Sequence, residues 1–240
     1  MKAIFYFKKM KKIPNHVVVI PDGNRRWARS QGLKPWLGHT YSIENTKAIF
    51  EEALRMGIPC FSFWASSRDN LTKRTKAEVS LLLNSFKKEF TRLAKDEQIH
   101  KNKVKINILG DWRKQFPVEV KKPMEKAIEV TKKYNKFNLN LLIAYSGIEE
   151  SIQALRAISK EGISQITPQV IKNYLYTKDL PAVDYLIRTG GEPHMSSGFM
   201  MWDIADAQMY FSDKLWPEFT INDFRKAIKE YEIRGRRFGK

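Results

Sequence analysis

The stretch His16–Trp27 reads HVVVIPDGNRRW, and it contains the change from strand to helix that decides the fold. Val17–Ile20 is a short run of branched apolar residues, which is typical of a strand buried on both faces. Pro21, Asp22 and Gly23 interrupt this run, and the arginines that follow lead into a sequence able to form a helix. A buried strand followed at once by a helix indicates an α/β protein with a parallel sheet.

The same alternation continues along the rest of the chain. Four further apolar runs indicate strands, at Cys60–Trp64, Val104–Leu109, Asn138–Ala144 and Tyr185–Arg188. Apolar residues recur at helical spacing between them, most clearly over residues 79–93, and Thr220 with Asp223 resembles a capping box. There is no internal repeat or low-complexity linker. The sequence therefore predicts one α/β domain over residues 14–240, with an open, mostly parallel central sheet flanked by helices, after an N-terminal extension over residues 1–13.

Composition limits the classes of partner. The chain has 240 residues, of which 42% are hydrophobic, and this is enough for a sizeable core. No run approaches the roughly 20 apolar residues of a membrane-spanning helix, and the single cysteine excludes a disulfide framework. The formal net charge of +17 favours phosphate-bearing metabolites, acidic lipid surfaces or nucleic acid, although a lysine-rich surface would give the same value. Because no nucleic-acid-binding motif accompanies the charge, we expect no nucleic-acid partner. The lone thiol suits a cytoplasmic location.

The residues after the first strand have the properties of a phosphate site. Gly23 allows the backbone to approach an anion closely, and Arg25 and Arg26 can add charge-assisted hydrogen bonds. The Asp22 carboxylate would repel a bare phosphate, but it fits one bridged by Mg²⁺, which binds carboxylate, phosphate and water oxygens. The alternative is an ordinary Asx-turn with its arginines in solvent.

Two later strand ends carry related groups. Ser67, Asn70 and Arg74 follow the second predicted strand, where short polar residues are also common in ordinary loops. Arg188 ends a late strand, and two glycines and Ser196 follow it, which predicts a second anion site. Because ligands bind at the carboxyl ends of parallel strands, we expect these segments to form one site for two phosphorylated substrates.

Taken together, these blocks resemble the cis-prenyltransferases, the family that includes undecaprenyl diphosphate synthase. His16–Trp27 is similar to the family signature H-x-x-x-I-x-D-G-N-x-R-W. Further blocks match in the same order, at Gly38-His39, Arg188–Glu192, Ile204–Phe219 and Arg236–Gly239. The resemblance covers nearly the whole chain, and several ordered motifs together are far more specific than any one alone.

The resemblance implies an undecaprenyl diphosphate synthase-like fold. It also implies an enzyme that uses Mg²⁺ to condense an allylic prenyl diphosphate with isopentenyl diphosphate, giving a (poly)prenyl diphosphate. Asp22 matches the essential aspartate, which binds Mg²⁺ and the diphosphates, and Ser67, Asn70 and Arg74 fall in the family's mobile catalytic loop. The implied site for the allylic diphosphate consists of Gly23, Asn24, Arg25, Arg26, Trp27 and His39. The implied site for isopentenyl diphosphate consists of Arg188, His194, Ser196 and the terminal Arg237 and Gly239, which reach across a homodimer.

Three positions depart from the family pattern. His194 stands where a second arginine is usual, so a permanent charge and its bidentate fork are lost. Gln208 stands where the family has a glutamate implicated in metal binding, and a neutral amide is a weaker ligand for Mg²⁺ than a carboxylate. Leu71 replaces a tryptophan of the catalytic loop. Because the allylic half is intact, we expect ionisation of an allylic diphosphate at Asp22. A short product, an irregular coupling of two allylic units and a different acceptor all stay open.

Two alternatives concern partners. A non-catalytic subunit that binds a partner enzyme or lipid is the main rival function, but the presence of both Asp22 and Arg188 favours an enzyme. Residues 1–12 combine aromatics with lysines, so they could lie on an acidic membrane surface or form a solvated terminus. The resemblance implies a homodimer, the lone thiol favours the cytoplasm, and peripheral membrane contact stays open.

Overall fold

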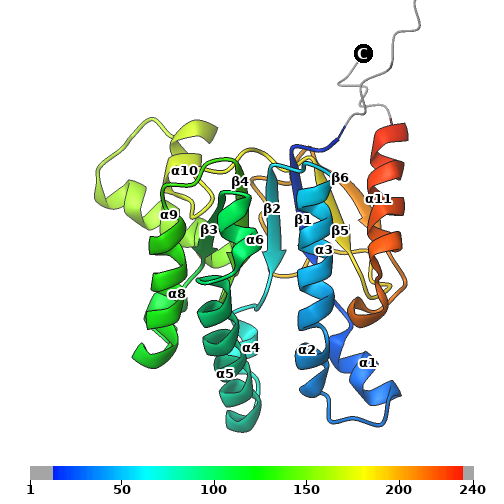
Figure 1. The fold of residues 1–240 in the computed structure, drawn as a ribbon. Coiled ribbons are helices and arrows are strands. Elements are labelled where there is room, and N and C mark those ends of the chain that lie inside the picture. The colour runs from blue at the N-terminus through cyan, green and yellow to red at the C-terminus, as the bar shows by residue number, and fades with distance from the viewer. Residues whose placement is uncertain (1–12, 235–240) are drawn as a thin grey trace, which may run out of the picture.

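The computed structural model describes residues 13–234. They form a six-stranded sheet with helices around it (Figure 1). Its strands are β1 (His16–Ile20), β2 (Cys60–Trp64), β3 (Val104–Leu109), β4 (Phe137–Leu142), β5 (Tyr185–Arg188) and β6 (Gln208–Phe211). Their order across the sheet is β3-β4-β2-β1-β5-β6, and each of these neighbouring pairs is parallel. The predicted open α/β sheet is therefore confirmed. The extension over residues 1–13 lies almost wholly outside the described residues.

Apart from one-residue shifts at the starts of β1 and β4, the strands differ from the prediction in two places. β4 ends at Leu142 rather than Ala144, because Ala144 has a φ of 52° and turns the chain out of the extended conformation. β6 was not predicted. It has only four residues, all of them partly or fully exposed at the edge of the sheet, so it lacks the apolar run that marks the other strands.

The helices and the single 3-10 turn lie between and around the strands. They are α1 (Asn24–Ser30), α2 (Leu37–Tyr41), α3 (Ile43–Arg55), α4 (Asp69–Thr72), α5 (Lys76–Leu93), α6 (Glu97–Lys101), α7 (Trp112–Gln115), α8 (Val118–Thr131), α9 (Gly147–Lys160), α10 (Pro168–Tyr174), η1 (Trp216–Glu218) and α11 (Ile221–Ile233). The capping box predicted at Thr220 and Asp223 is confirmed at the start of α11. A second box begins α5, where Thr75 accepts from the Glu78 amide and the Glu78 side chain accepts from the Thr75 amide.

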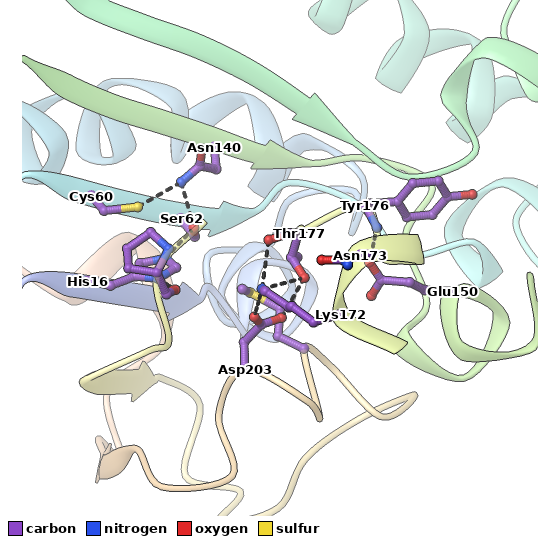
Figure 2. A network of polar contacts seen from close by, with 12 residues as sticks. His16, Cys60, Ser62, Asn140, Glu150, Lys172, Asn173, Tyr176, Thr177 and Asp203 are labelled. Atoms are coloured by element: carbon purple, nitrogen blue, oxygen red, sulfur yellow. Dashed lines mark hydrogen bonds and ion pairs between the residues drawn. The ribbon is translucent and has the colours of Figure 1, made fainter. Parts of the chain in front are cut away.

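The two faces of the sheet are covered differently. On one face, which we call the cavity face, Val17, Val19, Phe61 and Phe63 point toward buried side chains of α3, α5, α8 and α11. On the other, which we call the closed face, Val18, Ile20, Trp64 and Leu186 pack against Tyr145 and the segment 199–204. The closed face also carries a group of buried polar side chains, which Figure 2 shows from close by.

This topology determines where a site can lie. β1 stands between β2 and β5, so the carboxyl ends of these three strands meet at one edge of the sheet. α1, α2 and α4 lie at the same edge, at the bottom of Figure 1. The segments that follow Ile20, Trp64 and Arg188 are therefore neighbours in space, as the sequence predicted.

Candidate active site

Asp22 and Arg188 form the centre of the site. The Asp22 carboxylate accepts a hydrogen bond from the Gly23 amide at 2.6 Å, and the guanidinium of Arg188 donates to its other oxygen at 3.0 Å. The Arg188 side chain is only 3% exposed, and it also donates to the His194 carbonyl at 2.5 Å and to the Ser196 hydroxyl at 3.1 Å. A single arginine thus links the end of β1 to the loop that follows β5.

Further charges surround this pair. Arg26 lies 3.6 Å from the Asp22 carboxylate and 3.6 Å from that of Glu192, which is itself 3.8 Å from Arg188. The Arg26 side chain is 42% exposed, so it is free to turn toward an incoming anion. Glu192 lay within a recognised motif, but it was not predicted as a site residue. Its spacing four residues after Arg188 was the signal that sequence reasoning could have used.

Two glycines allow the chain to fold this closely. Gly23 has a φ of 106°, and a Cβ there would meet Leu215 atoms at 2.7–2.9 Å. Gly190 has a φ of 96°, and a Cβ there would lie 2.5 Å from the Arg26 guanidinium and 3.1 Å from Asp22. A larger residue at Gly23 would press on Leu215, and at both positions the left-handed backbone would be strained.

His39 and Arg74 form a second cluster beside Arg25. Arg74 donates to His39 Nε2 at 3.2 Å, which makes this ring nitrogen an acceptor and the imidazole neutral. Burial, together with the positive charges of Arg74 and Arg25, lowers the pKa of His39 to about 4. Arg25 lies 3.3 Å from Glu78, the buried glutamate that caps α5. Glu78, which sequence reasoning missed, thus ties the start of α5 to the first phosphate-binding segment.

The predicted catalytic loop is held by a reciprocal contact. The Ser67 amide donates to the Asn70 side chain, and the Asn70 amide donates to the Ser67 hydroxyl, both at 3.2 Å. This arrangement fixes the turn that leads into α4 and turns the loop toward the end of β1. Ser67, Asn70 and Arg74 all line one cavity together with Asp22 and Arg188.

That cavity has a volume of about 500 Å³ and runs from these charged groups into an apolar space between α3 and α5. The predicted site residues that line it are Asp22, Gly23, Asn24, Arg25, Arg26, His39, Ser67, Asn70, Arg74, Arg188 and Ser196. Its apolar wall includes Phe50, Phe61, Phe63, Leu82, Phe86 and Phe90. On α5, Leu82, Phe86 and Phe90 line the cavity, whereas Val79 and Leu83 do not.

Several predicted residues lie elsewhere. Trp27 packs against Tyr41 with ring centroids 5.4 Å apart and does not line the cavity. The exposed His194 lies 3.6 Å from Glu192 and 3.3 Å from the Ser196 hydroxyl, at the rim of the site. Arg237 and Gly239 fall outside the described residues.

The residues present fit a metal ion that arrives with its diphosphate. No group of three or more His, Cys, Asp or Glu side chains able to hold an ion occurs among residues 13–234. Asp22 offers one carboxylate, and Mg²⁺ commonly uses one or two carboxylates plus substrate phosphates. Gln208 pairs with Tyr185 at the start of β5, whereas Arg188 ends that strand. Within one chain, the register of β6 therefore places Gln208, the doubtful second metal ligand of the sequence prediction, at the opposite end of β5 from Arg188.

No helix within the described part of the chain combines the length and the apolar character needed to cross a bilayer.

Comparisons with known proteins agree with this geometry. Residues 20–239 match the model of a family described as "Putative undecaprenyl diphosphate synthase". A tritrans,polycis-undecaprenyl-diphosphate synthase (geranylgeranyl-diphosphate specific) from Thermococcus kodakarensis is 38% identical over 97% of this chain and 89% of its own length. An isoprenyl transferase from Thermus thermophilus is 37% identical over 95% of this chain and 89% of its own length.

A solved structure shows the same fold. The lavandulyl diphosphate synthase from Lavandula x intermedia, crystallised in complex with dimethylallyl diphosphate, superimposes with a TM-score of 0.85. It is 30% identical, and the match covers 95% of this chain and 99% of that one. The chain therefore belongs to the undecaprenyl diphosphate synthase family of cis-prenyltransferases and is an enzyme that transfers prenyl groups.

Proposed function

We propose that the protein condenses an allylic prenyl diphosphate with isopentenyl diphosphate, in a reaction that depends on a divalent metal ion, and releases a polyprenyl diphosphate. The observation that carries this proposal is the Asp22–Arg188 pair at the head of an apolar cavity. One end of the cavity suits a diphosphate and the rest suits a hydrocarbon chain. The geranylgeranyl-diphosphate specificity in the name of the Thermococcus relative favours a long allylic starter.

The first step is loss of the diphosphate from the allylic carbon. Negative charge grows on the departing oxygens, and Arg25 and Arg26 already line the cavity beside Asp22, where they stabilise that charge. A bound Mg²⁺, held by Asp22 and the diphosphate itself, would supply further charge neutralisation. The neutral His39, whose Nε2 accepts from Arg74, keeps its proton on Nδ1 and can donate one hydrogen bond there without adding a second full charge.

The second step joins the two substrates. Arg188 and Ser196, which are hydrogen-bonded to each other, hold the diphosphate of the acceptor on the opposite side of Asp22. The acceptor alkene attacks the allylic cation, a carbon–carbon bond forms, and a proton leaves the adjacent carbon. A diphosphate oxygen takes this proton, with Asn70 positioned on the neighbouring loop to orient or relay it.

The departures in the acceptor half keep a second outcome in view. The lavandulyl diphosphate synthase match was crystallised with dimethylallyl diphosphate, and His194 occupies the rim with neither a permanent charge nor a bidentate fork. An irregular coupling of two allylic units is therefore the competing reaction. The complete Asp22–Arg188 centre supports an active enzyme over a non-catalytic subunit. We also propose a homodimer, as the family resemblance implies.

Incubation of the purified protein with labelled isopentenyl diphosphate, an allylic diphosphate and Mg²⁺ tests the proposal. We expect labelled polyprenyl diphosphates that disappear on chelation of the metal. The variant Asp22→Asn should lose activity about a thousandfold, because the amide keeps the shape but not the charge of the carboxylate. Asp179→Asn, on an exposed loop, serves as the matched control and should keep wild-type turnover.

A product formed from two allylic molecules, without incorporation of labelled isopentenyl diphosphate, would instead establish the irregular reaction. A protein inert toward every allylic diphosphate would support the non-catalytic subunit, and full activity in Asp22→Asn would remove the central role of this carboxylate.

A further inference from the structure

Trp64 is the last residue of β2, and its indole N–H group has no hydrogen-bond partner within the described part of the chain. The residue is only 9% exposed, so this donor lies away from water. A buried N–H group that makes no hydrogen bond is costly, and its presence in a folded protein needs a reason. Trp64 also lines the cavity of the active site, so a bound ligand can supply the missing acceptor.

Unpartnered buried atoms gather at this cavity. Within residues 13–234, six buried side-chain nitrogen or oxygen atoms lack a partner, and four of them belong to residues that line the cavity. These four atoms are Asn24 Oδ1, Arg25 Nε, Trp64 Nε1 and Arg188 Nε. Three of the four are N–H donors, which suit the oxygen atoms of a diphosphate. Arg25 and Arg188 already have a place in the proposed reaction, whereas Trp64 has none.

The register of the sheet places Trp64 on the same side as Arg188. These two residues end β2 and β5, and Ile20 ends β1, which lies between the two strands. Ile20 pairs with Arg188, and the pairing of β1 with β2 stops one residue before Trp64, so all three stand at one level. Side chains at one level of a parallel sheet project from the same face, so the indole and the guanidinium lie on one side with Ile20 between them. Because neighbouring strands are about 4.8 Å apart, the Cα atoms of Trp64 and Arg188 are roughly 10 Å apart, which leaves room for one anion between the side chains.

The ring of Trp64 is also fixed to the loop that follows β5. It packs on Phe199, with the ring centroids 4.8 Å apart. The Phe199 amide donates to the Ser196 carbonyl at 3.0 Å, and the Ser196 hydroxyl accepts from Arg188 at 3.1 Å. Trp64 therefore belongs to the acceptor half of the site rather than to the allylic half, which lies on α1.

We infer that the indole N–H of Trp64 donates a hydrogen bond to the diphosphate of the acceptor, which makes Trp64 a further substrate-binding residue. This inference rests on the proposed function. His194 stands at the rim of the acceptor half without a bidentate fork, so this half has room for another directed donor. The indole is neutral and can only donate, so it selects by the position of an oxygen atom rather than by charge. It therefore favours the acceptor diphosphate beside Arg188 over the allylic diphosphate beside α1.

Nuclear magnetic resonance of the indole groups tests this contact without turnover. The chain has six tryptophans, and in protein isotope-labelled at the indole nitrogens the variant Trp64→Phe identifies the signal of Trp64. We expect isopentenyl diphosphate alone to move the proton signal of Trp64 downfield, as a hydrogen bond to an anion does, and an allylic diphosphate alone to move it much less. Trp202, whose N–H donates to Ser151 at 3.0 Å outside the cavity, is the internal reference and should not move.

Steady-state kinetics separate a lost contact from lost packing. Trp64→Phe keeps an aromatic ring against Phe199 but removes the N–H donor. The KM for isopentenyl diphosphate should rise about tenfold, which is the effect of losing one hydrogen bond to a charged group. The KM for the allylic diphosphate and kcat should both change less than about twofold, because the lost contact binds the acceptor equally before and during the reaction. Trp202→Phe is the matched control and should keep all three values.

Three results would overturn the inference: an unmoved Trp64 signal with isopentenyl diphosphate, a shift caused only by the allylic diphosphate, or an equal rise in both KM values. Thermal unfolding by circular dichroism checks that Trp64→Phe folds. If it does not fold, the signal of Trp64 in the wild type is assigned from backbone resonances and the spectral test stands by itself. Failure of the proposed function looks different, since the wild type would then form no condensation product, while the indole signal still reports whether isopentenyl diphosphate binds at Trp64.

Discussion

Polar side chains of similar types occur in two places in the sheet, but only one of these groups lies where a ligand can reach it. On the cavity face the strands are apolar, and the charged groups of the site lie at the carboxyl edge of the sheet, where Asp22 and Arg188 line an open cavity. On the closed face, His16, Ser62 and Asn140 stand inside the sheet, and all are fully buried. The difference shows that access to a ligand, rather than the presence of reactive side chains, distinguishes a site from a structural network.

The closed-face network has every partner that it needs (Figure 2). His16 Nδ1 lies 2.8 Å from the Pro181 carbonyl, which can only accept, so this nitrogen carries the proton. The Ser62 hydroxyl then donates to His16 Nε2 at 2.7 Å, and Asn140 donates to Ser62 at 3.0 Å. Burial lowers the pKa of His16, which therefore stays neutral. The network contains a serine–histidine pair, but none of its members lines the cavity. Its role is therefore structural.

The largest effect on the closed face is expected from Lys172→Met. Lys172 forms an ion pair with Asp203, whose side chain is only 2% exposed. Lys172 also donates to the Thr177 carbonyl at 2.7 Å. Loss of the lysine leaves a buried carboxylate without its counter-ion. The free energy of unfolding, measured in urea, should fall by about 3 kcal/mol.

Activity per folded molecule should change much less in that variant, because Lys172 does not line the cavity. Lys160→Met, on the exposed last turn of α9, is the control and should stay within about 0.5 kcal/mol of the wild type. If the urea concentration at the midpoint of unfolding is the same for Lys172→Met and the wild type, the closed face does not stabilise the fold in the way described.

Arg188→Lys tests the site at the carboxyl edge of the sheet. The lysine keeps the charge but cannot donate at once to Asp22, the His194 carbonyl and Ser196 in the geometry of the guanidinium. We expect kcat/KM for prenyl transfer to fall about 10- to 100-fold, measured by incorporation of labelled isopentenyl diphosphate. Arg225→Lys, in the ion pair with the buried Glu52 outside the cavity, should keep wild-type kcat/KM. Equal losses in both variants would show that the effect comes from general stability rather than from the site.

The sequence predicted the cavity face better than the closed face. Residues 16–27 were enough to indicate the first strand and the Asp22 carboxylate, because local chemistry and strand order bring the strand ends together. The place of Gln208 depends on the register of β6, a short edge strand whose pairing no local pattern specifies. The partners of His16 lie 46 and 165 residues away, so its neutrality depends on tertiary packing. Glu89 and Arg92, which also line the cavity, were missed because they have the spacing of any exposed helix pair.

The smallest expected effect compares the two faces through their histidines. The pKa of His39 in the folded chain is about 4, lowered by burial and by Arg74 and Arg25, whereas an unfolded histidine titrates near 6.5. Between these values the unfolded state binds more protons, so stability falls as the pH falls through this window. From roughly pH 7 to pH 5.5 the loss due to His39 should be about 1 kcal/mol, and His39→Gln should remove it from the urea-unfolding curves.

Burial is also the main cause that lowers the pKa of His16. His16 therefore adds its own loss of stability at low pH, which remains in the His39→Gln variant. Inorganic pyrophosphate separates the two histidines. An anion bound beside Asp22 favours the protonated form of His39, which lines the cavity, and should therefore reduce the acid sensitivity of the wild type. It cannot reach His16, so the residual pH dependence of His39→Gln should be the same with and without pyrophosphate. A pyrophosphate effect of equal size in both proteins would mean that the imidazole of His39 does not sense the diphosphate site, and that the electrostatic difference between the two faces lies elsewhere.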